Sequence, residues 1–210
     1  MKKTNLISLI AFIVTQVMNA QNISNDNQSS IEFNFGRNIH GSGDISGYQY
    51  GFVYTDVISN RFYWFLGFEG TLNDDADFPL TFEDTEGNVF DSTLHTVIAG
   101  FQLAGGIRYN IFQNKNHNFG ISVGPVFRYQ ASSLNDDVST LFPVITMLPA
   151  PVRIIINNEP ARTFAVGGTL RLHYSYKINN KSFISIHGGF QGDTNGDTIP
   201  NLSLGFGKSF

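Results

Sequence analysis

The strongest constraint on this chain is a strict alternation of apolar and polar side chains. In the segment 163–177, TFAVGGTLRLHYSYK, one parity carries Phe164, Val166, Leu170 and tyrosines, and the other carries small or polar residues. Successive side chains of a β-strand point to opposite faces, whereas a helix repeats about every 3.6 residues. This unbroken alternation therefore predicts a long strand with one apolar face.

The same pattern recurs along the chain and predicts seven further strands. In the segment 61–72, Tyr63 and Phe65 interrupt the face that otherwise carries small or polar side chains. The eight predicted strands are 31–38, 45–57, 61–72, 97–110, 118–130, 163–177, 182–191 and 199–210. The prediction is an all-β fold, and its even strand number is typical of a transmembrane antiparallel barrel.

The connections between these strands alternate between short turns and longer loops. Short turns lie near 58–60, 112–117 and 179–181, whereas the connections on the other side include two long loops, 73–95 and 131–161. Short turns at one end and longer loops at the other are typical of an up-and-down meander. Structureless loops this long are uncommon inside a compact soluble domain.

The N-terminal residues have the layout of a secretory signal peptide. Lys2 and Lys3 precede an apolar run, 6–14, and the small residue Ala20 follows it. The run is too short to cross a membrane as a helix, which disfavours the alternative of an N-terminal anchor. We expect a signal peptide at 1–20 and a single barrel domain at 21–210.

The amino-acid composition excludes several classes of protein. Cysteine is absent, so neither a disulfide framework nor a lipidated cysteine is expected. Without Lys2 and Lys3 the chain has 11 basic and 17 acidic residues, a net charge of −6. A mildly acidic chain lacks the basic face that nucleic-acid binding requires.

Alternation alone does not say which face of the barrel is apolar. A soluble lipocalin-type barrel has its apolar face inside, and that alternative stays open from the pattern. The apolar parity here carries more large side chains than an eight-stranded interior can hold, whereas the other parity is rich in glycine, serine and threonine. Aromatic residues also tend towards the strand ends, as in an interfacial girdle: Tyr48, Tyr54, Tyr109, Tyr129, Tyr174 and Tyr176. We expect the apolar face to contact lipid.

The last predicted strand completes the pattern. Leu202, Leu204, Phe206 and Phe210 share one parity, and Lys208 departs from it. This row resembles the C-terminal assembly signal of outer-membrane barrels. With the signal peptide, the eight strands and the loop rhythm, the chain resembles the small eight-stranded Gram-negative outer-membrane β-barrel family, the OmpA membrane-domain and OmpX type. The resemblance implies an outer-membrane location, contact with lipid and lipopolysaccharide, and recognition by the barrel assembly machinery.

Several charged residues fall on the lumen parity. Glu69, Arg128 and Arg171 lie near mid-height, and Glu32 and Arg108 lie lower. Charges in a narrow barrel must be paired or hydrated, so we expect Glu69 to pair with Arg128 and Arg171. The OmpA resemblance implies comparable internal salt bridges. Such a cluster is a structural plug or, less readily, a gate.

Two histidines share the lumen parity. If 179–181 is a three-residue turn, His173 lies directly across from His187. Two imidazoles without a third ligand make a poor metal site. We therefore expect two histidines in a polar lumen, and neither a metal nor a cofactor.

The long loops differ in chemistry. The first is acidic between 73 and 91 and contains the turn sequence EDTEGN, whereas 141–156, LFPVITMLPAPVRIII, is apolar. DTNGD, 193–197, resembles half of a calcium loop but lacks its glycine and its glutamate, so it predicts a tight turn. Both long loops are candidate surfaces for an extracellular or envelope protein partner.

Three classes of function fit these features. The first is a non-enzymatic structural or interaction barrel, the second a narrow channel for small solutes or ions. The third is an enzyme acting on lipid A or phospholipid, which requires a nucleophile and a base at the outer rim. His95 with Ser92 and Asp91, and His40 with Ser42 and Asp44, are the candidates, but neither group matches a known motif. We therefore expect no enzyme.

Overall fold

The computed structural model describes residues 28–210, except 42–44, 79–80, 85, 92, 134–137, 149 and 156–160. The predicted signal peptide, 1–20, lies outside the described residues. No helix among the described residues is long and apolar enough to cross a membrane.

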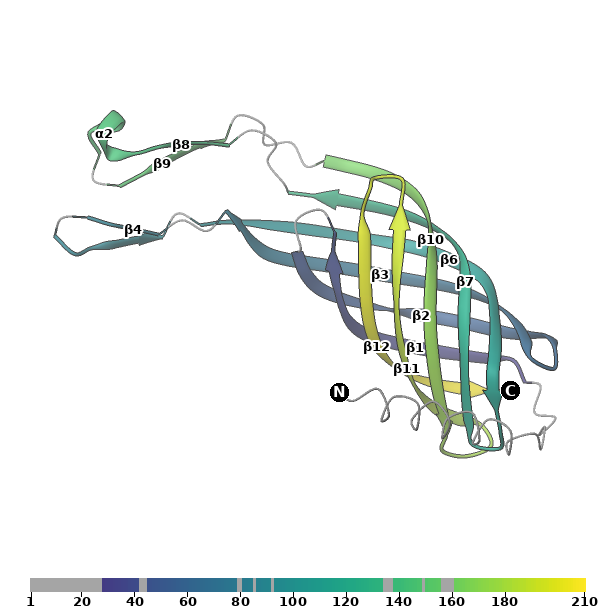
Figure 1. Ribbon diagram of the computed structural model, residues 1–210. Coiled ribbons are helices and arrows are strands. Elements are labelled where there is room, and N and C mark those ends of the chain that lie inside the picture. Colours follow the sequence, from purple (N-terminus) through teal and green to yellow (C-terminus); the bar gives the residue numbers. More distant parts are fainter. Residues whose placement is uncertain are drawn as a thin grey trace, which may run out of the picture.

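Eight antiparallel strands close into an up-and-down barrel (Figure 1). Each barrel strand pairs with the barrel strand before it and the one after it, as the alternation and loop rhythm predict. The barrel strands are β1 (Ser30–His40), β2 (Ile45–Ser59), β3 (Phe62–Phe78), β6 (Leu94–Gln113), β7 (His117–Ser132), β10 (Ala161–Lys177), β11 (Ser182–Asp193) and β12 (Thr198–Ser209).

The last strand closes the barrel against the first. Pairing of β1 with β12 runs from Ser30 opposite Ser209 to Asn38 opposite Asn201. The backbone N–H of Phe210 then donates to the carbonyl of Ser29 at 2.9 Å. Closure matters because an unpaired backbone edge is not tolerated in hydrocarbon.

Four neighbouring strands are longer than the sequence pattern predicts. β3 and β6 remain paired up to Phe78 and Leu94, and β7 and β10 up to Ser132 and Ala161. The ends of the predicted loops 73–95 and 131–161 are therefore strand, which corrects their bounds. Once both faces of a strand meet water, pairing continues but the hydrophobic alternation stops, so the sequence gives no signal there.

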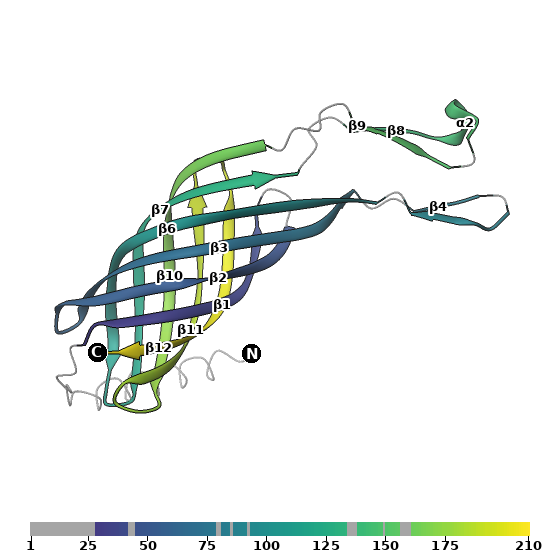
Figure 2. The same cartoon turned by 180° about the vertical axis from the view of Figure 1, so that it is seen from behind.

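Described residues of both loops form two hairpins beyond the long-loop end of the barrel (Figures 1 and 2). The first pairs β4 (Thr81–Glu83) with β5 (Val89–Asp91), around the predicted turn. The second pairs β8 (Val138–Leu141) with β9 (Val152–Ile155), and its tip carries the short helix α2 (Pro143–Thr146).

The apolar parity faces outward, so the soluble-barrel alternative is wrong. Side chains exposed on the outer face include Phe33, Phe35, Phe52, Leu66, Phe68, Phe101, Leu103, Val123, Phe127, Phe164, Leu172, Ile186 and Leu204. The interior holds buried polar side chains such as Asn34, Gln49, Glu69, Gln102, Arg128, Thr169 and Ser203. A lipid-facing apolar band around a polar lumen is the arrangement of a transmembrane barrel.

A small apolar layer interrupts the polar lumen. Phe65, one of the two residues that break the alternation of β3, is buried with Val53, Ala104 and Val126. The other, Tyr63, is also buried on the lumen face. These side chains fill space that smaller polar residues would leave open.

Aromatic rings gather on the outer face near the short turns. Tyr54 packs against Trp64 with ring centroids 5.2 Å apart and against Phe210 at 6.4 Å. Phe62 and Tyr109 pair at 4.9 Å farther around the barrel. Amphipathic rings at this level are typical of a membrane–water interface.

A charge at mid-height on the outer face tests the lipid contact. We expect Phe68→Lys to lower the free energy of unfolding by about 2–4 kcal/mol, because the ammonium is placed in hydrocarbon. Val89→Lys, on the β4–β5 hairpin, is the matched control: Phe68 is 57% exposed and Val89 69%. Reversible denaturant unfolding in lipid vesicles measures both. Equal effects of the two substitutions would contradict the lipid-facing assignment.

Candidate functional site

The predicted lumen residues all face the barrel interior. Glu32, Glu69, Arg128, Arg171, His173 and His187 are buried, and Arg108 lines an internal cavity. They form three groups along the barrel axis. One group lies near the long-loop end, one in the middle, and one near the short turns.

The middle group is a bidentate ion pair between Glu69 of β3 and Arg171 of β10. Arg171 Nη1 lies 2.5 Å from Glu69 Oε1, and Nη2 lies 2.7 Å from Oε2. Gln102 Nε2 donates to Oε2 at 2.7 Å, and Arg171 Nε donates to Thr169 Oγ1 at 3.2 Å. Parallel N–H···O bonds of this kind combine charge with fixed geometry, which is what a buried pair requires.

Glycines provide the space for this pair. A Cβ at Gly51 would lie 2.8 Å from Glu69 Cγ, and one at Gly189 would lie 2.8 Å from Arg171 Cγ. Each glycine stands directly across from its charged neighbour, in the pairings Gly51 with Glu69 and Arg171 with Gly189. The small residues of the lumen parity therefore accommodate the long charged ones.

Arg128 does not join Glu69, contrary to the expectation from the sequence. Its Nη2 lies 2.7 Å from Asp193 Oδ2 and 2.5 Å from Asp197 Oδ2, at the turn between β11 and β12. His40 Nε2 adds a contact to Asp197 at 3.4 Å and one to Gln130 Oε1 at 3.1 Å. The guanidinium binds these aspartates because the turn folds inward over the long-loop end of the lumen.

Asp193 and Asp197 were missed by sequence reasoning, although a signal was present. Asp193 has the lumen parity of β11, shared with His187 and Gln191, and Asp197 has the parity of Ile199 on β12. The segment does form the predicted tight turn, with Gly196 at φ +81°. Only the inward direction of the carboxylates escaped prediction.

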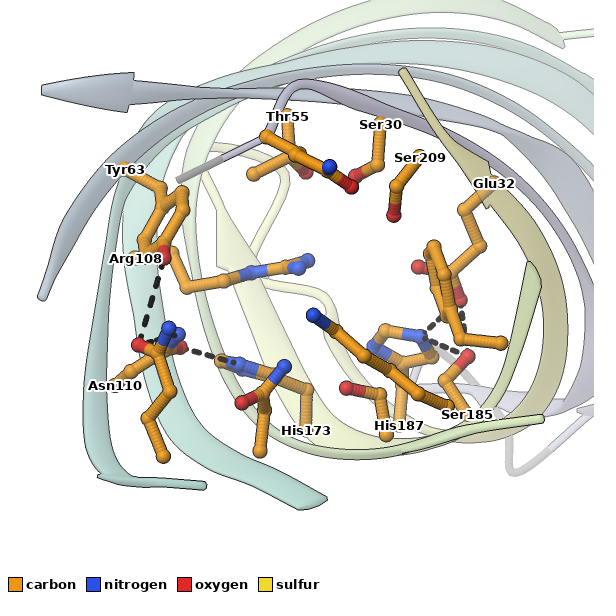
Figure 3. A pocket seen from close by; sticks show the side chains of 16 residues that line it. Ser30, Glu32, Thr55, Tyr63, Arg108, Asn110, His173, Ser185, His187 and Ser209 are labelled. Atoms are coloured by element: carbon orange, nitrogen blue, oxygen red, sulfur yellow. Dashed lines mark hydrogen bonds and ion pairs between the residues drawn. The ribbon is translucent and has the colours of Figure 1, made fainter. Parts of the chain in front are cut away.

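The third group lies near the short turns (Figure 3). His173 stands directly across from His187, with ring centroids 6.3 Å apart. His187 Nε2 lies 2.5 Å from Glu32 Oε1, which also accepts a hydrogen bond from Ser185 Oγ. His173 Nε2 lies 3.1 Å from Asn110 Oδ1. The two imidazoles therefore bind different partners.

Arg108 of β6 extends into the cavity between these residues (Figure 3). The cavity has an empty volume of about 640 Å³, part of it open to solvent. Its walls include Glu32, His173 and His187. In the described ranges, no group of three or more histidines and acids is placed to hold a metal ion.

Among the described residues, the candidate catalytic side chains are not brought together as a nucleophile and a base. His95 is exposed and its Nδ1 lies 3.3 Å from Asp74 Oδ1, whereas His40 is buried in the Arg128 group. Ser42, Asp44 and Ser92 lie outside the described residues.

The carboxylate of Asp84 stabilises the turn of the acidic β4–β5 hairpin. Asp84 accepts hydrogen bonds from the side chain and backbone of Asn88, at 2.8 and 2.9 Å, and these bonds lower the pKa of Asp84. Gly87 adopts a φ of +85° within the same turn. This carboxylate is thus committed to the hairpin geometry.

Solved structures share this fold. The crystal structure of Neisserial surface protein A (NspA) aligns with a TM-score of 0.55 and 9% identity, over 87% of this chain and 97% of that one. Ail, the attachment invasion locus protein of Yersinia pestis, aligns with a TM-score of 0.50 and 10% identity, over 88% and 99%. Ail in complex with the heparin analogue sucrose octasulfate gives 0.51 and 11%, over 87% and 98%. No protein-family model and no curated protein matches the sequence.

The closed eight-stranded barrel, its apolar outer face and these structural neighbours define the class. The chain is a β-barrel of the transmembrane type, and it shares its fold with the outer-membrane proteins Ail and NspA.

A double-mutant cycle tests the middle ion pair. We expect Glu69→Leu and Arg171→Met each to lower the free energy of unfolding by about 3–5 kcal/mol, because each leaves one buried charge unpaired. The double variant should lie much closer to wild type, and denaturant unfolding in vesicles measures all four proteins. Simple addition of the two single effects would show that the carboxylate and guanidinium do not depend on each other.

Proposed function

We propose that this chain is a non-enzymatic outer-membrane barrel that acts through its two long loops while its lumen stays closed. The observation that carries the proposal is an apolar tip on the β8–β9 hairpin, held outside a lumen crossed by buried ion pairs. The barrel then serves as a membrane-fixed support for an interaction surface.

The ion pairs support a closed lumen. Arg128 with Asp193 and Asp197 crosses the lumen near the long loops, and Glu69 with Arg171 crosses it in the middle. The apolar layer around Phe65 fills further space. Breaking a buried pair is costly because it leaves an uncompensated charge, so these groups favour a plug over a gate.

The hairpin tip supports an interaction role. Val144 and Met147 are each 93% exposed, and Ile145 is 70% exposed. Phe142 and Leu148 are also exposed beside them. A contiguous exposed apolar group is typical of a site that contacts another protein or a membrane. Its distance from the barrel favours an extracellular or envelope protein partner over the barrel's own lipid.

The first hairpin narrows the chemistry of that partner. Glu83, Asp84, Glu86 and Asp91 make the β4–β5 hairpin acidic. A dense polyanion such as the heparin analogue bound by Ail is therefore a poor match for this loop. A partner surface with apolar and basic side chains fits both hairpins better.

We propose two further contacts for the barrel. Outer-membrane lipid and lipopolysaccharide are the proposed surroundings of the apolar face. Leu202, Leu204, Phe206 and Phe210 are exposed in one row on the outer face of β12 and its end, which suits the proposed recognition by the barrel assembly machinery.

Conductance separates the plug from the channel alternative. We expect the refolded mature protein to give no discrete conductance steps in a planar bilayer, because buried ion pairs cross its lumen. Heat-shifted mobility on a gel checks that the barrel has formed. Discrete steps in wild type that change in Glu69→Ala would instead establish a narrow channel with Glu69 in its gate.

Attachment tests the role of the apolar tip. We expect the triple substitution Val144→Ser, Ile145→Ser and Met147→Ser to lower attachment of barrel-expressing cells to other cells several-fold, since the apolar contact is lost. Val89→Ser, an exposed apolar position on the other hairpin, is the control. Surface amounts are equalised by antibody labelling. Attachment that is unchanged in the triple variant, or equally reduced in the control, contradicts the tip as the contact.

A further inference from the structure

The cavity near the short turns contains a cation without a protein acceptor. Within the described part of the chain, no residue accepts a hydrogen bond from the Arg108 guanidinium, and its Nε is buried without a partner. Figure 3 shows this side chain reaching into the open centre of the cavity. A guanidinium presents several N–H donors in a planar fork, and a group with that capacity is costly to leave unpaired.

Glu32, the acid of the cavity walls, binds other side chains. Glu32 Oε1 binds His187 Nε2 at 2.5 Å and accepts from Ser185 Oγ, on the β11 side of the cavity. No ion pair joins Glu32 to Arg108 in the described residues, although their charges act on each other. Among the described residues, no carboxylate of the cavity walls therefore lies in hydrogen-bond contact with the Arg108 guanidinium.

A chain of hydrogen bonds sets the tautomer of His173 on the opposite side. Tyr63 Oη and Asn110 Nδ2 both donate to Gln113 Oε1, at 3.4 and 3.2 Å. Asn110 Oδ1 is then left to accept from His173 Nε2, 3.1 Å away. In the neutral imidazole this bond leaves Nδ1 as a bare acceptor, and Nδ1 is buried without a partner.

We propose that this cavity binds a small oxyanion of the phosphate class, entering from the short-turn end of the barrel. Two phosphate oxygens would accept hydrogen bonds from the Arg108 guanidinium, and a P–O–H group would donate a hydrogen bond to Nδ1 of His173. The ligand thus satisfies one unpaired donor group and one unpaired acceptor with a single molecule.

The need for acceptor oxygens at Arg108 and an O–H donor at His173 defines which anions the cavity selects. Sulfate offers acceptor oxygens to Arg108 but has no O–H at neutral pH, so it leaves His173 Nδ1 unpaired. A phosphodiester headgroup lacks the O–H as well and is bulkier. Inorganic phosphate keeps a P–O–H group in both of its ionic forms near pH 7, whereas the dianion of a phosphomonoester and a membrane phosphodiester have none.

Isothermal titration of the refolded barrel tests the site, in a maltoside detergent and a phosphate-free buffer. The probes are inorganic phosphate, glycerol phosphate, sulfate and glycerophosphocholine, each at matched ionic strength. At pH 7.5 we expect saturable binding of inorganic phosphate, and at least tenfold weaker binding of the glycerol phosphate dianion, sulfate and the diester. Arg108→Gln should weaken phosphate binding at least tenfold, because the bidentate cation is removed.

The controls separate the site from general electrostatics and from misfolding. Lys115→Gln removes a cation from the exposed turn between β6 and β7 and should bind phosphate like wild type. Heat-shifted gel mobility checks each barrel. Lack of saturable phosphate binding by wild type overturns the proposal without reference to any variant. Sulfate binding as tight as phosphate, or equal weakening in Lys115→Gln, overturns it as well.

Discussion

The structure depends on one requirement, that no backbone N–H or C=O stays unpaired in hydrocarbon. A single strand in lipid would leave a row of such groups without partners, at a cost of several kcal/mol each. Eight strands meet the requirement only when the first pairs with the last, as Ser30–Asn38 does with Asn201–Ser209. Closure then places one parity of every strand against lipid and the other in the lumen, so the apolar and polar faces follow directly from it.

The lumen faces the opposite problem, since its polar side chains are removed from bulk water. Charges there are tolerated when paired with good geometry. Glu69 and Arg171 meet this condition in the middle, and Arg128 meets it with two aspartates near the long loops. The condition is not met by protein groups at Arg108. The interior therefore changes from buried ion pairs at the long-loop end to an incompletely paired cavity at the short-turn end.

The two ends of the barrel consequently differ in what they offer. Long neighbouring strands carry two hairpins away from the membrane at one end, and the apolar tip around Val144 and Met147 has no cover within the described chain. At the other end, aromatic rings lie at the interface and the cavity opens between short turns. The proposed protein contact and the proposed small-anion site therefore lie at opposite ends of the barrel, with the buried ion pairs between them.

The sequence by itself determined the number of barrel strands, the closed all-β architecture, the outward apolar face and the lumen position of Glu32, Glu69, Arg108, Arg128 and Arg171. Those features depend on parity, which is local and survives in the bare sequence. It also placed His173 across from His187, since a short turn sets the register. Only the tertiary structure decided that Arg128 binds Asp193 and Asp197 rather than Glu69, and that β3 and β6 continue into the predicted loop. Side-chain pairing across a lumen depends on barrel tilt and on turns that fold inward, and strand length beyond the membrane depends on pairing without any hydrophobic signal. Both are relations between distant segments, which residue spacing does not encode.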